Sequence, residues 1–266
     1  METLEKLIGK VSRTLLVLVT PLLAFTGHSA TVGYDVDNVA ERLYVCFTAG
    51  NMDEWARVVA DLEQEFNVSK STRVEFELLH AQYGLIGFLL SKQDELEAER
   101  YIAGAEDHIE HLLQVNPEYV EAISIKAAIL AYKIAINPLK AFYLGPKSRG
   151  LIDRAMQIEP SNPFALIESG NFEHYAPLIL GGSTAKAVKF YQMAIDRLLH
   201  LNGGEAPKTW WYLNALTQLA LAAEKAHNYP LATKTFEDIL ALEPNYQWIR
   251  DDVYPKYLKK VGAEQR

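Results

Sequence analysis

The stretch that decides the fold is Leu213–Tyr246, LNALTQLALAAEKAHNYPLATKTFEDILALEPNY. It reads as two short helices joined at residues 227–229. Small and apolar residues lie on one face of each helix, because they recur three or four positions apart: Leu216, Leu219, Ala220 and Ala223 in the first, and Ala232, Phe236 and Ile239 in the second. Pro244 then ends the second helix, since its ring cannot continue the hydrogen-bond ladder.

The pattern of the second helix recurs along the chain, with a small residue, an apolar one four positions on, and another three further. Two of the earlier copies also end in proline, and the third has Leu199 in its place: Ala105, Ile109, Leu112 and Pro117; Ser148, Ile152, Ala155 and Pro160; Ala187, Tyr191 and Ala194. One helix pair cannot bury its own apolar face, so repeated pairs are expected to stack.

These residues resemble the tetratricopeptide repeat family, whose unit is a helix pair of about 34 residues. The resemblance is best over residues 95–246, within a repeat domain of residues 30–266. It implies an all-α fold, a right-handed superhelix of antiparallel helix pairs that serves as an interaction scaffold. The apolar and lysine stripes of residues 247–266 predict a C-terminal capping helix.

Residues 1–29 are predicted to be a signal peptide, or an N-terminal anchor if they are not cleaved. Basic residues precede the apolar run TLLVLVTPLLAF, Thr14–Phe25, which is short for a membrane span. We therefore expect an exported protein of the bacterial periplasm or cell envelope. Membrane contact is expected only through an uncleaved N-terminus. The net charge of −8 argues against a nucleic-acid partner.

Two insertions within the repeats are predicted to form neighbouring loops, Asn137–Pro146 and Ala176–Gly182. They are apolar where surface loops are normally polar, at Phe142, Tyr143, Leu178 and Leu180. These side chains either pack against their own helices or form a patch for a protein partner or a lipophilic small molecule. Pro146 suits the first position of a helix, and Ser183 or Thr184 can cap another.

The second candidate site is the concave groove, which the first helices line in repeats of this kind. Residues beside the packing positions mix amide, hydroxyl, aromatic and acidic groups that suit recognition of a protein or peptide: Asn171, His174, Tyr175, Asn214, Thr217 and Glu224. The alternative is that any such array exposes a similar mixture without a specific partner.

Neither a metal, a cofactor nor an enzymatic activity is expected. His108 and His111 lie three apart on one helix, but no third ligand is identifiable and the repeat register turns both outward. No nucleophile motif and no phosphate-binding loop occurs. The single cysteine, Cys46, lies in an apolar run and is interpreted as a buried hydrophobic residue.

A narrower resemblance involves the segments NPLKAFYLGPKS, Asn137–Ser148, and APLILGGSTAKAVKFYQMAI, Ala176–Ile195. They are similar to bacterial envelope repeat proteins, including the T-component proteins of tripartite periplasmic (TRAP) transport systems. That resemblance implies an accessory protein that partners a substrate-binding protein and takes up a lipophilic ligand. Two functions are thus open, a protein–protein interaction scaffold that uses the groove and a ligand-binding accessory protein that uses the apolar loops.

Overall fold

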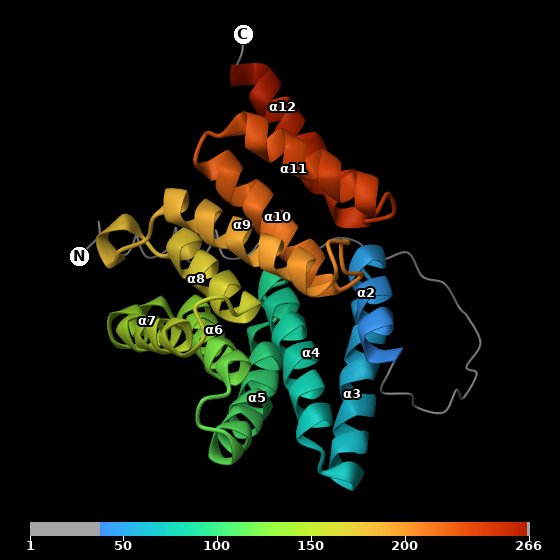
Figure 1. Ribbon diagram of the computed structural model, residues 1–266, viewed down its shortest axis with the longest axis vertical. Coiled ribbons are helices and arrows are strands. Elements are labelled where there is room, and N and C mark those ends of the chain that lie inside the picture. Colours follow the sequence, from blue (N-terminus) through green and yellow to red (C-terminus); the bar gives the residue numbers. More distant parts are fainter. Residues whose placement is uncertain (1–37, 265–266) are drawn as a thin grey trace.

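The computed structural model describes residues 38–264, and this part of the chain is entirely helical (Figure 1). The α-helices are α2 Val39–Ala49, α3 Met52–Ser69, α4 Thr72–Ser91, α5 Glu95–Val115, α6 Val120–Ile136, α7 Ala141–Ile158, α8 Pro163–Tyr175, α9 Thr184–Leu201, α10 Trp210–Lys225, α11 Tyr229–Leu242 and α12 Tyr254–Glu264. Short turns of 3₁₀-helix precede α7 and α9 (η2 Pro138–Lys140 and η3 Leu178–Leu180), and a π-helical turn precedes α12 (η4 Ile249–Val253).

The segment predicted to be a signal peptide lies outside the described residues. Within residues 38–264, no helix combines the length and the apolar character that crossing a bilayer requires.

The predicted helical register is confirmed in α5, α7, α9 and α11. All of its twelve packing residues are at most 4% exposed. They share this burial although they differ in size, from Ala105, Ala187 and Ala232 to Tyr191 and Phe236. The small residues let the paired helices approach closely, and the larger ones fill the space between them.

Polar residues at the helix starts account for the short connections. The side chains of Asn51, Asp94, Asn162, Ser183 and Asn228 each accept a hydrogen bond from a backbone N–H in the first turn of the helix that follows. Such caps satisfy donors that have no partner within the helix, so each chain reversal is compact.

The N-terminal helix pair packs against the C-terminal part of the chain. The ring centroids of Trp55 and Trp210 lie 5.1 Å apart, as do those of Phe47 and Tyr246. The hydroxyl of Tyr44 donates to Glu243 at 2.9 Å. Figure 1 shows α2 beside the start of α10, and these two helices are in contact. An open repeat array makes contacts only between neighbours, so this closure departs from the arrangement that the resemblance implies.

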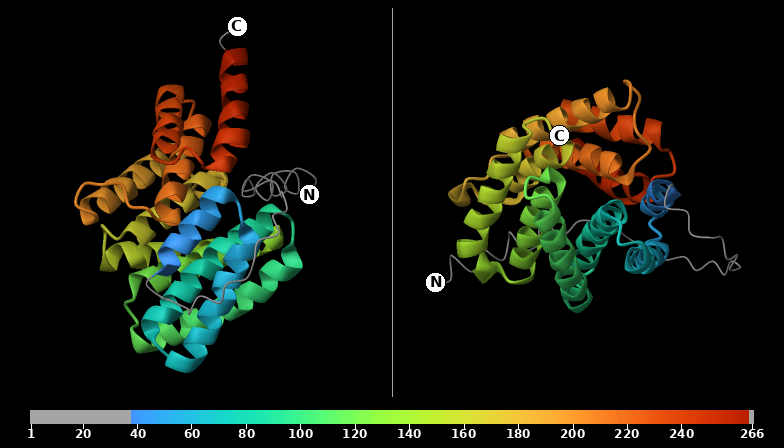
Figure 2. Two further views of the ribbon diagram at one scale, coloured as in Figure 1. Left: turned by 90° about the vertical axis from the view of Figure 1, so that its right-hand side faces the viewer. Right: turned by 60° about the horizontal axis from the view of Figure 1, so that its bottom comes forward.

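The closure brings the first helices of the pairs together around a shared core. The Tyr83 hydroxyl of α4 donates to Glu168 of α8 at 2.7 Å, and His80 of α4 lies 4.8 Å from the Trp210 ring of α10. Figure 2 gives two further views, in which the C-terminal helix, coloured red, lies at one end of the molecule. Much of the surface that was expected to be an open groove is therefore interior.

The end of the array is covered by Trp248, η4 and α12. Trp248, Ile249, Val253 and Tyr257 are all buried, and the Tyr257 hydroxyl donates to the carbonyl of Tyr229 at 2.9 Å. The helix begins just before Pro255, after the π-helical turn. A proline in the first turn of a helix needs no N–H, so Pro255 is accommodated at the start of α12.

Candidate ligand-binding cavity

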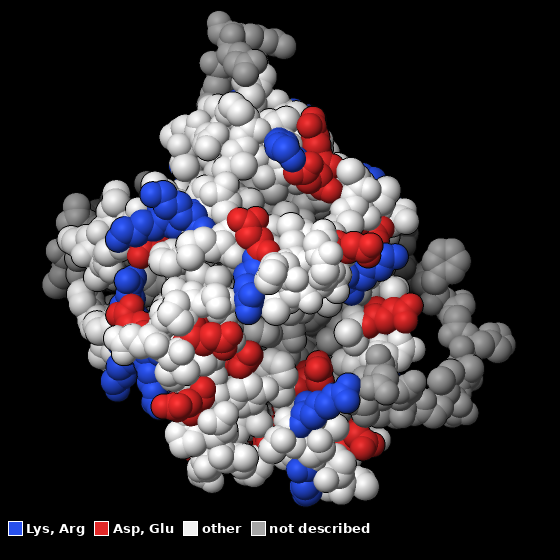
Figure 3. All heavy atoms as spheres, in the orientation of Figure 1, with Lys and Arg blue, Asp and Glu red and all other residues white. Residues whose placement is uncertain are grey.

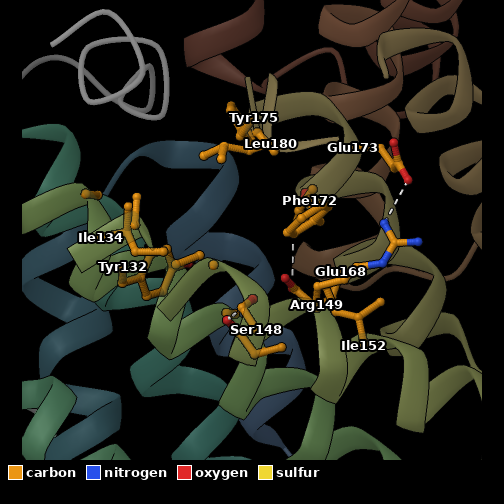
Figure 4. A pocket seen from close by; sticks show the side chains of 18 of the residues that line it. Tyr132, Ile134, Ser148, Arg149, Ile152, Glu168, Phe172, Glu173, Tyr175 and Leu180 are labelled. Carbon is orange, nitrogen blue, oxygen red and sulfur yellow. Dashed lines mark hydrogen bonds and ion pairs between the residues drawn. The ribbon is translucent and has the colours of Figure 1, made fainter. Parts of the chain in front are cut away.

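A cavity of about 530 Å³ lies between α4, α6, α7, α8 and α10 (Figure 4). Its wall is mainly aliphatic and aromatic, with a few polar groups. The lining includes Tyr83, Ala127, Ala128, Ala131, Tyr132, Ala135, Pro138, Ala141, Gly145, Pro146, Arg149, Glu168, Asn171, Phe172, Glu173, Tyr175, Pro177, Leu180, Gly181, Lys186, Asn214 and Gln218. A volume of this size accommodates a small organic ligand.

Small residues on α6 leave this space. Ala127, Ala128, Ala131 and Ala135 all line the cavity from one face of that helix, and Gly145 faces them from α7. Methyl groups and hydrogens cannot reach across to α8, so the gap between the helices stays open. In a well-packed core such a stretch would be opposed by large side chains.

The floor of the cavity carries a buried carboxyl group, that of Glu168. The residue is 6% exposed, and its Oε1 accepts hydrogen bonds from the Tyr83 hydroxyl at 2.7 Å and from Asn171 Nδ2 at 3.1 Å. Within the described residues, no protein donor contacts Oε2. Burial raises the pKa of Glu168 to about 7, against the two hydrogen bonds, which lower it. The group can therefore accept or donate a hydrogen bond near neutral pH.

Tyrosine rings form much of the aromatic wall, while their hydroxyls are directed to protein acceptors. The Tyr132 hydroxyl donates to the carbonyl of Tyr83 at 3.4 Å, and that of Tyr175 donates to Gln218 Oε1 at 2.6 Å. Burial raises the pKa of both hydroxyls well above the ordinary value of 10. Both stay neutral, so the tyrosines present apolar ring surface to the cavity.

Charged and exposed residues mark the mouth. Arg149 Nη1 contacts Glu173 Oε1 at 2.9 Å, and the Lys186 ammonium lies 3.9 Å from the same oxygen. The Arg149 guanidinium also lies 5.1 Å from the centroid of the Phe172 ring. Arg149 Nε also contacts Asp153 Oδ1 at 2.9 Å, so the two cations at the entrance are matched by two carboxylates, those of Glu173 and Asp153. Leu180, which is 44% exposed, forms an apolar edge of the same entrance.

The cavity joins residues from both predicted sites. Asn171, Tyr175 and Asn214 were expected in the groove, and Leu180 was expected in an apolar loop, yet all four line this one space. The two insertions also line it, at Pro138 and Pro177, as neighbouring loops would. Part of each predicted surface therefore meets in this one cavity.

The other predicted residues lie elsewhere. Thr217 is fully buried and donates to the carbonyl of Leu213 at 2.8 Å. His174 is 4% exposed, and burial, with a smaller effect of Lys225, lowers its pKa to about 3. Glu224 accepts from Lys260 at 2.8 Å, away from the cavity. Three apolar loop residues are exposed and do not line it: Phe142, Tyr143 and Leu178.

The insertion Asn137–Pro146 is helical, so the prediction of a loop there is wrong. The helix α7 begins at Ala141, after the turn η2, and Pro146 lies inside it. The side chain of Asn137 accepts from the N–H of Leu139 at 3.2 Å and starts the turn. Pro146 therefore does not stand at the first position of a helix as predicted, and its missing N–H leaves the carbonyl of Phe142 without the usual helical partner. The prediction of a cap at Ser183 is confirmed.

Of the two histidines of α5 that were expected to face outward, His111 does so, with 48% of its side chain exposed, whereas the side chain of His108 is 17% exposed. Their Nδ1 atoms contact the buried carboxylate of Glu75, His108 at 3.1 Å and His111 at 2.6 Å. Because α4 packs along α5, it brings Glu75 against this face. In residues 38–264, no cluster of three or more potential ligands could hold a metal ion.

Several cavity residues were missed, chiefly Glu168, Tyr132 and Arg149. The signal for Glu168 was present, since it is the one acid within the packing stretch Ala165–Gly170, ALIESG. A carboxylate there is rarely buried unless it is bonded or functional. Tyr132 and Arg149 carry no comparable signal, because helix surfaces commonly expose such residues.

The turn that holds Leu180 at the mouth depends on Gly182. A Cβ at this position would lie 1.9 Å from the carbonyl oxygen of Ala176, so the backbone would have to move. We expect Gly182→Ala to lower the free energy of unfolding by about 1–3 kcal/mol through overpacking. Thermal denaturation measures this loss. The matched change Gly150→Ala has open space around it and should be nearly neutral or stabilising, and equal effects of the two would contradict the geometry.

The described residues thus form an all-helical fold with a largely apolar cavity between its helices. Neither a family model nor a curated protein matches the chain. Among solved structures, the fold is similar to that of the HusA haemophore from Porphyromonas gingivalis, with a TM-score of 0.58 and 18% sequence identity. The match covers 73% of this chain and 95% of that one.

Proposed function

We propose that this chain is a non-enzymatic binding protein that holds a small amphipathic molecule in the cavity between α6, α7 and α8. The observation that carries the proposal is the cavity itself, about 530 Å³ with a mainly apolar wall and the buried Glu168 in its floor. The apolar wall accommodates the body of the ligand. Glu168 Oε2 binds one polar group, and Arg149 and Lys186 bind an acidic group at the mouth.

The fold neighbour is a haemophore, which makes a flat apolar molecule with carboxylates a reasonable candidate. The tyrosine rings and Phe172 suit such a body, and the cations at the mouth suit its acids. Among the described lining residues there is no histidine, methionine or cysteine, and the tyrosine hydroxyls are held neutral. Coordination of an iron atom is therefore not part of the proposal.

The ligand-binding role has more support than the scaffold role. A scaffold that uses the groove would need Asn214 and Thr217 at the surface, and they are 9% and 0% exposed. In this proposal the protein is exported. It consists of helix pairs of the tetratricopeptide type, and the N-terminal pair packs against the C-terminal part of the chain. An accessory role in transport of a lipophilic compound agrees with such a ligand, as the resemblance of the segments Asn137–Ser148 and Ala176–Ile195 implies.

Titration of the full chain with protoporphyrin IX and with oleate tests the proposal. Both probes combine an apolar body with carboxylates, one flat and one extended. We expect one of them to bind in a saturable manner and to quench tryptophan fluorescence, because Trp210 and Trp211 lie in the same core as the floor of the cavity. Absence of saturable binding for both, with a protein partner captured by cross-linking instead, would favour the scaffold role.

The protonation of Glu168 should make the free energy of unfolding depend on pH. Its pKa is about 7 in the folded chain, above the ordinary 4.5, so the folded state holds this proton more tightly. Stability from this group is therefore present at about pH 4.5 and is lost as the pH rises through 7. We expect Glu168→Gln to gain about 3 kcal/mol of stability relative to wild type between pH 4.5 and 8, the free energy that corresponds to this shift in pKa.

The difference between the two proteins should be measured by urea denaturation across this pH range. Burial lowers the pKa of His80 and, with a smaller effect of Lys225, that of His174, each to about 3. Protonation of both therefore destabilises the fold below about pH 6.5 in wild type and variant alike. Comparison with the variant cancels that contribution. A difference that does not change with pH would mean that Glu168 is ionised throughout and that the floor is well hydrated.

A further inference from the structure

Exposed apolar side chains gather around the mouth of the cavity. The described residues include thirteen large apolar side chains that are exposed, and six of them lie in the two short segments 137–150 and 174–190. We call these six residues the apolar rim: Leu139, Phe142, Tyr143, Leu178, Ile179 and Leu180. Single exposed apolar residues are ordinary, whereas a group of six is typical of an interaction surface.

Both segments border the same entrance. One contributes Pro138 and Ala141 to the wall of the cavity, and the other contributes Pro177 and Leu180. The turn η3 holds Leu178 and Ile179 outward, at 88% and 77% exposure. If these apolar side chains packed against their own helices, which is the alternative given in the sequence analysis, they would be buried. The rim instead projects from the edges of the opening through which a ligand must pass.

The charge of these two segments is opposite to that of the rest of the chain. They contain five basic residues and no acidic one, which leaves 21 basic against 34 acidic residues elsewhere. Two of the five are paired with acids next to the segments, Arg149 with Glu173 and Asp153, and Lys186 with Glu173. Elsewhere acids are plentiful, and on the face shown in Figure 3 they are interspersed with basic residues. Lys147 and Lys189 are exposed, and neither forms an ion pair with any residue in the described part of the chain.

We infer that the apolar rim docks on the surface of an anionic lipid bilayer. Apolar side chains that flank lysines are the combination that holds peripheral proteins at a membrane, since the chains enter the headgroup region and the cations attract the lipids. The mouth then faces the membrane, so an apolar ligand can pass between bilayer and cavity without crossing water. This contact is separate from the one expected of the N-terminal segment, and it goes beyond the proposed ligand binding.

A fluorescent label on the rim tests the docking directly. Cys46 is the only cysteine of the chain and is buried, so an environment-sensitive dye on Leu178→Cys reports the rim alone. Val68→Cys, at a side chain of 85% exposure on α3, is the matched control. The full chain is mixed, without added ligand, with vesicles of phosphatidylethanolamine and phosphatidylglycerol. We expect a blue shift and quenching by brominated lipid at residue 178, and neither at residue 68.

Charge reversal separates the electrostatic attraction to the lipids from the insertion of the apolar side chains. Lys147→Glu with Lys189→Glu should weaken binding to these vesicles on the order of tenfold, and added salt should do the same to wild type. Vesicles of phosphatidylcholine alone should bind more weakly. The inference is overturned if the dye at 178 stays in water while the protein sediments with vesicles. It is also overturned if the blue shift needs a second copy or a protein partner instead of lipid. Loss of ligand binding in the cavity would leave these results unchanged.

Discussion

Replacement of Trp55 by alanine is expected to lower the free energy of unfolding by about 3–5 kcal/mol, the usual cost of removing a large buried aromatic. The ring is 1% exposed and meets Trp210 edge-on at 5.1 Å. It lies so close to Gly84 that a Cβ there would come within 2.6 Å of it. Its Nε1 also donates to the carbonyl of Ala81 at 2.9 Å, and that acceptor would lose its partner.

Chemical denaturation of Trp55→Ala measures this loss, and Leu96→Ala is the control, since that side chain is 82% exposed and should change stability little. The double variant Trp55→Ala with Trp210→Ala should lose less than the sum of the two single losses, because the rings contact each other. A loss below about 1 kcal/mol for Trp55→Ala would mean that the N-terminal pair is not held against α10.

Ala131→Trp is expected to abolish ligand binding while the protein stays folded. Ala131 lines the cavity from α6 and is only partly buried, so an indole there would project into the open space. We expect the affinity for whichever probe binds, protoporphyrin IX or oleate, to fall on the order of a hundredfold or more, because ligand and side chain would occupy the same volume.

The control is Ala241→Trp, which places the same side chain on the exposed face of α11. Its probe affinity should equal that of wild type, and both variants should unfold near the wild-type temperature. If Ala131→Trp binds the probe as well as the control does, the ligand lies outside the cavity. Circular dichroism distinguishes that result from a loss of binding through unfolding.

The helices and their packing faces could be predicted because they depend on local spacing. The positions equivalent to Ala232, Phe236 and Ile239 are buried in all four second helices, since a helix can bury only the residues that share one face. The closure could not be predicted. It depends on contacts between residues far apart in the chain, such as Trp55 with Trp210, and each aromatic alone is consistent with packing between adjacent repeats.

Part of the site could also be predicted from local helical spacing. Asn171, Tyr175 and Asn214 follow from the helical register, which places them beside the packing positions on first helices. The register does not tell whether such residues face solvent or a neighbouring helix. Closure buried Thr217, and the small residues of α6 left the cavity, which no pattern of apolar residues indicates. From the sequence alone, the alanine-rich face of α6 predicts close helix packing. Whether it leaves a cavity depends on the side chains of the helix opposite.

The most direct test of the central claim is a crystal structure of the chain grown with the probe that binds. We predict density for the apolar body between α6, α7 and α8, with a polar atom within hydrogen-bond distance of Glu168 Oε2 and an acidic group near Arg149. Ligand density on the outside of the molecule, with the space beside Ala131 empty or filled by side chains at saturating probe, would contradict the account.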